Sequence, residues 1–145
     1  MRAVVCRVDR ASVDADGQSA GAIERGLLVL VGVLAGDGPP QVAWMARKLV
    51  QLRIFPDDQD RMNRSVADVD GQLLLVPNFT LAATMGKGTR PSFSDAALPA
   101  EAERLFEQLL AECGQAVPTE RGRFGAHMQI EALFNGPVTI LLETP

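Results

Sequence analysis

The chain has 145 residues, of which 47% are hydrophobic and 22% are charged, and its formal net charge is -4. These proportions match soluble globular domains and argue against a disordered or membrane-embedded protein. The acidic balance also argues against a general nucleic-acid coat, because such proteins neutralise many phosphates and are usually basic. It does not exclude a local basic surface.

The apolar segments and the first residues indicate a cytoplasmic protein. The longest apolar run, residues 27–35, is interrupted by Gly32 and is much shorter than the ~20 residues that a membrane-spanning helix needs. Arg2 and Arg7 bring charge into the first positions, which is unlike a secretory signal.

The first third of the sequence predicts three strands. Residues 4–13 alternate between apolar and polar positions, which predicts a half-buried strand, and Asp16-Gly17 predicts a turn to a hairpin partner over residues 18–24. Residues 27–33 are apolar on both faces, which is typical of a strand in the middle of a sheet that is covered on two sides.

The rest of the chain predicts helices mixed with short strands. Turn residues followed by apolar residues at helical spacing predict helices over residues 40–51 and 99–114. The loop between them at residues 83–95 is long enough to suggest a function. Further strands are predicted over residues 53–55, 72–76, 128–134 and 138–142. We therefore predict a single α+β domain over residues 1–145, with a curved mixed β-sheet packed against about two main helices.

Ionisable side chains suited to catalysis are scarce. His127 is the only histidine, and the sequence lacks the Gly-x-Ser-x-Gly elbow of a serine nucleophile. Cys6 and Cys113 have no metal-ligand spacing, and we expect both to be buried, reduced thiols. The acidic residues at 57–60 lack the glycine and the terminal glutamate of a calcium loop. We therefore predict no metal site and no cofactor.

Two short segments, residues 77–81 and 135–139, carry most of the functional information. They offer backbone groups and the Thr80 hydroxyl, but Thr80 has no base to activate it and also fits an ordinary hydrogen-bonded strand residue. Only ~5–6% of X-Pro bonds in folded proteins are cis, so Gly136-Pro137 is most simply a trans turn. A cis bond there would instead form a rigid, backbone-edged wall that tests the shape of a substrate.

The loop around Lys87 carries two glycines and the basic residues Lys87 and Arg90. Its sequence, GKGT at residues 86–89, lacks the glycine and the hydroxyl residue of a phosphate-binding loop at the required offsets. Lys87 and Arg90 either form a mobile lip that contacts phosphate or belong to a plain surface loop.

Six segments, in the same order along nearly the whole chain, resemble the D-aminoacyl-tRNA deacylases. They are RVDRASV (7–13), GLLVLVG (26–32), NFTL (78–81), RPSFS (90–94), GRFGA (122–126) and GPVT (136–139). The resemblance implies a homodimeric hydrolase that cleaves the ester between a D-amino acid, or glycine mischarged on alanine tRNA, and the terminal adenosine of tRNA. Such an enzyme performs chiral proofreading in translation.

The resemblance also implies roles for individual residues. Gly136 and Pro137 would form a cis peptide that reaches into the partner subunit's pocket and excludes an L side chain by steric contact, whereas a D side chain points away and glycine has nothing to reject. Phe79 and Thr80 would lie nearest the reacting ester as the catalytic segment. Asn78, Met128 and the same Gly-Pro peptide would contact the substrate. Arg7 would hold the Gly-Pro peptide in place. Lys87 and Arg90 would contact the tRNA.

The chain departs from the family pattern at several positions. Pro77-Asn78 replaces Ser-Gln, which removes one backbone donor and shortens one amide side chain. Phe134 replaces an asparagine and His127 replaces a common aspartate. Because no base lies near Thr80 in the sequence, we favour attack by water assisted by the ribose hydroxyl of the tRNA over attack by Thr80. The alternative to an enzyme is a non-catalytic dimeric module that binds a small metabolite.

Overall fold

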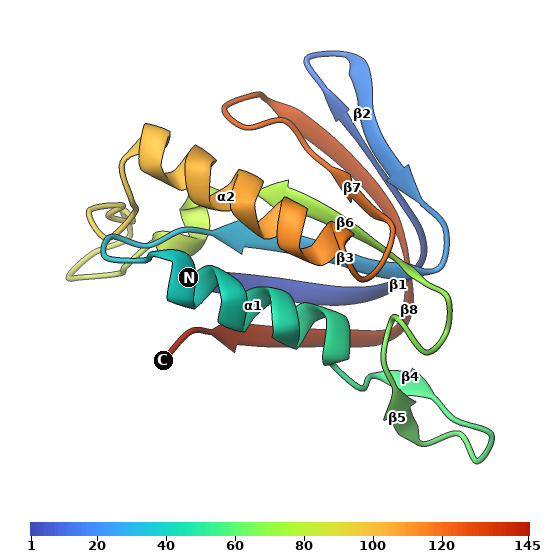
Figure 1. Cartoon of the computed structure of the whole chain (residues 1–145). Helices are drawn as coiled ribbons and strands as arrows, with labels where there is room; N and C mark the ends of the chain where they lie inside the picture. Colours follow the sequence, from blue (N-terminus) through green and yellow to red (C-terminus); the bar gives the residue numbers. More distant parts are fainter.

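The computed structural model describes residues 1–145 and shows a strongly curved sheet with two helices on one face (Figure 1). The helices are α1 (Pro39–Gln51) and α2 (Pro99–Gly114), which lie side by side. The sheet contains β1 (Arg2–Ala15), β2 (Gln18–Ile23), β3 (Gly26–Gly32), β6 (Gln72–Pro77), β7 (Thr119–Arg121) and β8 (Met128–Glu143). A hairpin of β4 (Phe55–Pro56) and β5 (Met62–Arg64) projects from one corner, and a short 3-10 helix, η1 (Phe79–Ala82), follows β6. The predicted α+β class with a curved mixed sheet and two main helices is confirmed.

Strand β1 organises the sheet because it pairs with three other strands. Its first half pairs with β3, its second half pairs with β2, and β8 lies antiparallel along its other edge. β3, β6 and β7 continue the sheet as parallel neighbours. The predicted turn between β1 and β2 is present, and Asp16 and Gly17 both have positive φ angles (51° and 78°), as two-residue hairpin turns of the I′ type require.

The hydrophobic core explains why β3 is apolar at every position. Leu27 and Val29 face the core under the helices, whereas Leu28 faces a second buried cluster inside the curve of the sheet. α2 contributes Phe106 and Leu109, both fully buried, to the larger cluster. Burying one such side chain stabilises the fold by roughly 1.5–3 kcal/mol, so the two-sided burial of β3 fixes the centre of the sheet. The sequence prediction for this strand is confirmed.

Three differences from the predicted elements concern short or bent strands. Strand β8 runs through residues 135–137 without ending, because β1 pairs with it on both sides of that bend. The strand predicted at residues 53–55 begins two residues later, at Phe55–Pro56, and pairs with the unpredicted β5. Strand β7 was not predicted, since Thr119, Glu120 and Arg121 give no apolar alternation.

Neither helix of the structure has the length and the apolar character needed to cross a lipid bilayer. Both cysteines are buried and unpaired, as predicted from the sequence.

The thiol of Cys113 generates a prediction about alkaline stability. Burial, with a smaller contribution from the nearby Glu112 carboxylate, raises the pKa of Cys113 from its ordinary value of 9.0 to about 12. The folded state therefore keeps a proton that the unfolded state loses, so stability falls as pH rises from 9 towards 12, by up to ~1.4 kcal/mol per pH unit. We expect urea titrations between pH 8 and 10.5 to show a steeper loss of unfolding free energy for the natural chain than for Cys113→Ala. Equal slopes would contradict this assignment.

Candidate active site

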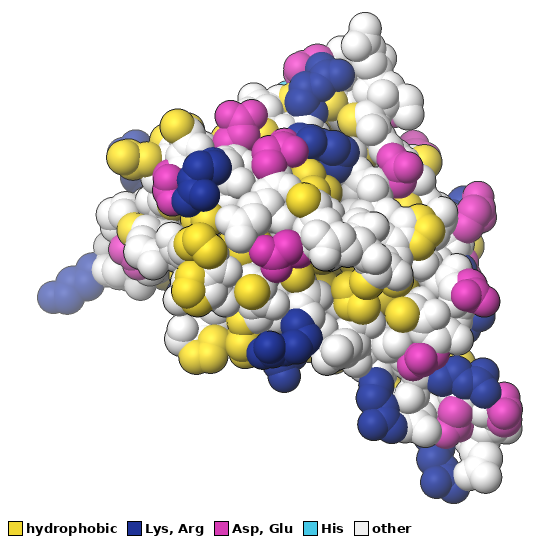
Figure 2. Space-filling model, viewed as in Figure 1, with side chains coloured by type: hydrophobic (Ala, Val, Ile, Leu, Met, Phe, Trp, Pro, Cys, Tyr) yellow, Lys and Arg dark blue, Asp and Glu magenta, His cyan; other side chains and the backbone are white.

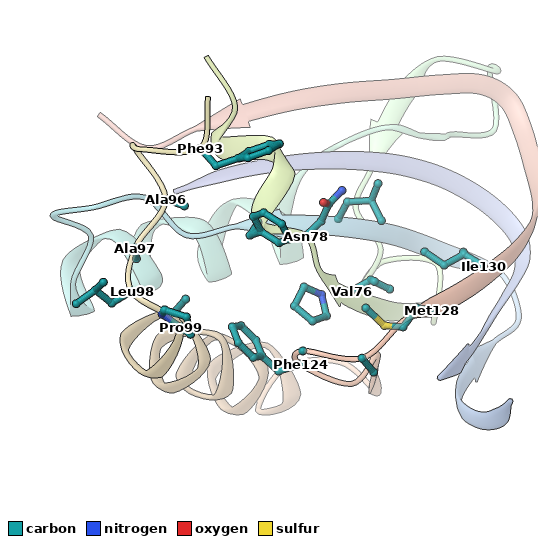
Figure 3. A pocket seen from close by; sticks show the side chains of 16 residues that line it. Val76, Asn78, Phe93, Ala96, Ala97, Leu98, Pro99, Phe124, Met128 and Ile130 are labelled. Atoms are coloured by element: carbon teal, nitrogen blue, oxygen red, sulfur yellow. The ribbon is translucent and has the colours of Figure 1, made fainter. Parts of the chain in front are cut away.

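A cavity of about 720 Å³ opens where β6 ends and η1 begins (Figure 3). The other walls are the segment that leads into α2, the turn before β8 and the first residues of β8. Phe93, Phe124 and Met128 point into this space from those three walls. None of the sixteen lining residues carries an ionisable side chain, and twelve of them are hydrophobic. The cavity therefore offers shape and backbone groups rather than acids or bases.

The turn that carries η1 is fixed to the central strands by its first residues. The Asn78 N–H donates to the Val31 carbonyl at 2.7 Å, which ties the turn to the end of β3. The side-chain oxygen of Asn78 accepts from the Thr80 N–H at 3.2 Å and caps the helix, a role that asparagine performs well. The Arg2 guanidinium donates to the Leu81 carbonyl at the other end of the turn. The backbone of η1 is thus held at both ends.

The Thr80 hydroxyl is committed to the same asparagine. It donates its proton to the Asn78 side-chain oxygen, which is a neutral amide and cannot act as a general base. Thr80 itself is exposed and does not line the cavity. Within this chain, the partner of the Thr80 hydroxyl is thus an amide rather than a base.

Phe79 is the residue of η1 that faces the cavity. As the first residue of a helix it has no N–H acceptor within that helix, and no backbone partner elsewhere takes its N–H. Its ring packs edge-to-face against Phe93, with the ring centroids 5.3 Å apart, and remains 60% exposed. The site thus combines one unused backbone donor with an apolar rim.

The Gly136-Pro137 peptide is cis and lies at a bend of β8 away from this cavity. On one side of the bend Thr139 pairs with Cys6, and on the other Phe134 pairs with Val8, so the residues between them bulge out opposite Arg7 alone. We call this bend, residues 135–138, the Gly-Pro corner; Asn135, Gly136 and Pro137 are exposed, whereas Val138 is buried in the core.

The Arg7 side chain holds the start of the Gly-Pro corner. Its Nε donates to the Asn135 carbonyl at 3.1 Å and its Nη2 donates to the Asn135 side-chain oxygen at 3.2 Å. Its Nη1 donates to the Ile54 carbonyl, next to the β4–β5 hairpin. The guanidinium therefore anchors the corner to two separate parts of the chain.

The predicted site residues fall into two groups that the chain keeps apart. Asn78, Phe79 and Met128 line the cavity, and Thr80 is hydrogen-bonded to Asn78 without lining it. Arg7, Gly136 and Pro137 lie together at the corner and do not line the cavity. Ile130 is the last cavity residue on β8, and the six residues from there to Gly136 span roughly 20 Å along a strand.

The two basic residues predicted to contact tRNA, Lys87 and Arg90, lie on an exposed loop. Lys87 and Arg90 are exposed on the loop that precedes Phe93, and neither forms an ion pair. On the face that carries the helices, acidic and basic side chains are interspersed (Figure 2). The two cations beside the cavity are therefore free to meet an anionic ligand.

Several lining residues were not predicted as site residues. Phe93, Leu98 and Phe124 are apolar residues in irregular segments, where no periodicity indicates which way a side chain points. In the sequence, Phe93 and Phe124 were marked only because they lie in segments 90–94 and 122–126, which resemble the family.

The family model of D-Tyr-tRNA(Tyr) deacylase matches residues 4–143. The chain belongs to this family. It is 51% identical to the D-aminoacyl-tRNA deacylase of Ruegeria pomeroyi and 49% identical to that of Shewanella amazonensis, in each case over 99% of both chains. The resemblance found in the sequence is thus confirmed, and the comparisons give no support to the alternative of a non-catalytic binding module.

Two solved structures share the fold of this chain. A structure named c-Myc DNA Unwinding Element Binding Protein has a TM-score of 0.94 at 38% identity, over 100% of this chain and 99% of that one. A probable eukaryotic D-amino acid tRNA deacylase has a TM-score of 0.82 over 97% of each chain, and at 15% identity that likeness concerns the fold alone.

The close approach of η1 to β3 generates a prediction. A Cβ atom at Gly32 would lie 2.8 Å from the Leu81 Cβ and 3.1 Å from the Asn78 carbonyl oxygen, so Gly32→Ala forces η1 away from the strand. We expect the free energy of unfolding in urea to fall by about 1–3 kcal/mol, as for other overpacked sites.

The matched control is Gly114→Ala at the end of α2, where a Cβ meets nothing within 4 Å. This control is expected to be neutral or slightly stabilising, because alanine favours helices more than glycine does. Equal effects of the two substitutions would show that the close packing of η1 against β3 does not depend on the absence of a side chain at Gly32.

Proposed function

We propose that this chain is a D-aminoacyl-tRNA deacylase that works as a homodimer in the cytoplasm, with residues 1–145 acting as one domain. It hydrolyses the ester that joins a D-amino acid, or glycine mischarged on alanine tRNA, to the terminal adenosine, and so removes wrong residues before translation uses them. The observation that carries this proposal is a cavity bordered by the family's NFTL turn but lined by no ionisable side chain. Such a cavity suits a reaction in which the substrate supplies the reactive groups.

The proposed reaction is attack by water on the ester carbonyl. A neighbouring ribose hydroxyl of the tRNA assists the water, the oxygen of the water bonds to the carbonyl carbon, and the bond to the ribose oxygen breaks. The ribose oxygen takes up the proton, so the products are free amino acid and intact tRNA. Phe79 would donate its unused N–H to the developing oxyanion, an interaction worth roughly 2.7–4 kcal/mol in other enzymes. Asn78 and Met128 would contact the bound aminoacyl group.

Chirality would be tested by the Gly-Pro corner of the partner subunit. The chain's own corner lies roughly 20 Å along β8 from its own cavity and is exposed, so it cannot close that cavity. The strand between the two carries exposed apolar side chains at Ile130, Leu133 and Phe134, as expected where another subunit docks. Once inserted, Gly136 and Pro137 would meet an L side chain and leave room for a D side chain.

The contact with tRNA would include Lys87 and Arg90. Both are exposed beside the cavity, and their flexible side chains suit the phosphates next to the terminal adenosine. This placement gives a chain of net charge -4 a local cationic contact where the substrate enters.

The first prediction concerns stereochemistry and salt. The natural chain should release the amino acid from D-aminoacyl-tRNA and leave the matched L-aminoacyl-tRNA intact, with KM rising as salt increases because phosphate contacts are lost. In a double substitution of Lys87 and Arg90 by alanine, the salt dependence of KM should be weaker and kcat little changed. Release of both enantiomers at equal rates, or of neither, would contradict the proposed function.

The second prediction separates the Thr80 hydroxyl from the Gly-Pro corner. Thr80→Val should keep kcat within about threefold of the natural value, because the lost hydrogen bond to Asn78 is exposed and worth only about 1 kcal/mol. Gly136→Val should abolish turnover, since Gly136 has φ of 135° and a Cβ there would lie 2.7 Å from the Val138 nitrogen. If the two substitutions reduced single-turnover rates equally, the Thr80 hydroxyl would take part in the reaction, contrary to this proposal.

A further inference from the structure

Asn135, the first residue of the Gly-Pro corner, is held from a second side by Asp9. The Asn135 side-chain nitrogen donates to the Asp9 carboxylate at 2.7 Å, while its side-chain oxygen and its carbonyl accept from Arg7. The carbonyl and both side-chain polar atoms of Asn135 are thereby committed. Nothing in the sequence pattern of the family segments marks Asp9 as more than a polar residue of the first strand.

The register of the sheet shows why two residues are available for this task. The pairing of β1 with β8 shifts twice, once between Cys6 and Val8 and again between Val8 and Arg10. Arg7 and Asp9 are the two residues that these shifts leave without a partner in β8. Because they are two apart in a strand, they project from the same face. They therefore bracket the point at which the corner leaves the sheet.

We propose that Asp9 is a positioning residue for chiral discrimination, an inference that rests on the proposed deacylase function. Arg7 alone contacts Asn135 through two parallel donors on one side, which leaves the amide free to swing about that contact. The Asp9 carboxylate fixes the other end of the amide and so sets the direction in which Gly136 and Pro137 project. A steric filter depends on this direction more than the hydrolytic step does, so loss of Asp9 admits L substrates while D substrates still react.

The test uses substitutions that remove, keep and reverse this hydrogen bond. Asp9→Ala removes the acceptor, and Asp9→Asn keeps an acceptor oxygen for the Asn135 amide. Asn135→Asp places two carboxylates in contact while Arg7 keeps its acceptor. The double variant D9N/N135D restores the bond with the donor and acceptor exchanged. The matched control is Asp14→Ala, an exposed aspartate of the same strand whose side chain forms no hydrogen bond or ion pair.

The first readout is the ratio of single-turnover rates on D- and L-aminoacyl-tRNA. We expect this ratio to fall about fivefold or more in Asp9→Ala and in Asn135→Asp, through faster release of the L amino acid, and to return towards the natural value in D9N/N135D. Asp9→Asn and Asp14→Ala should leave it within about twofold. An unchanged ratio in Asp9→Ala, or an equal change in Asp14→Ala, would overturn the proposal.

The second readout is hydrogen exchange of the backbone amides at residues 134–139, which requires no activity. Asp9→Ala should speed this exchange at the corner and leave the amides around η1 unchanged, and D9N/N135D should reverse the effect. If the natural chain showed no deacylation at all, the proposed function would fail, whereas faster exchange at the corner would still report the contact of Asp9. Active variants with unaltered selectivity and unaltered exchange would defeat the role of Asp9 alone.

Discussion

The antiparallel pairing of β8 with β1 along almost the whole of both strands is the constraint on which the site depends. One end of β8, at Met128, lies in the wall of the cavity, and the bend at Gly136 lies well beyond the cavity's last residue on that strand, Ile130. Because β1 holds β8 on both sides of the bend, the corner cannot fold back onto its own cavity. The two groups of predicted site residues therefore lie apart within one chain, and the proposed dimer would bring them together across the subunit boundary.

The chemistry of the cavity follows from the way η1 is built. Asn78 uses its side-chain oxygen to cap the turn and to accept the Thr80 proton, and the Phe79 N–H remains a free backbone donor of the segment. A backbone donor on a seated turn is well placed for electrostatic stabilisation, because it needs no reorganisation when charge develops. The departure from the family's Ser-Gln pair is compatible with this role, since Asn78 caps the turn directly. In the proposed mechanism, the shape of the site would select between enantiomers, and hydrolysis would depend on groups that the substrate brings.

The sequence predicted the parts of this molecule that depend on local patterns. The two-sided apolar run of β3, the stripe of α2 and the turn at Asp16-Gly17 each follow from periodicity or turn chemistry within a few residues. The ordered family segments supplied the residues that are proposed for the site. These predictions needed no knowledge of distant contacts.

What the sequence could not predict depends on pairing between distant segments. Asn135-Gly136-Pro137 has the composition of a strand break, and only the pairing with β1 on both sides keeps β8 continuous. Strand β7 is three polar or charged residues that pair because β6 offers a free edge. The apolar cavity walls at Phe93 and Phe124 lie in irregular segments, where composition gives no direction to a side chain. The separation of the corner from the cavity likewise depends on the tertiary structure.

The most direct test of the account is subunit complementation. One chain would carry Gly136→Val, which disables the corner, and another Ala126→Trp, which fills the cavity with its own corner intact. Each homodimer should be inactive, but co-refolded subunits should recover roughly a quarter of the natural D-aminoacyl-tRNA deacylation, because half of the dimers are mixed and each mixed dimer has one complete site. If the mixture stayed inactive although mixed dimers formed, or if either chain were active as a monomer, the corner would not act across the subunit boundary.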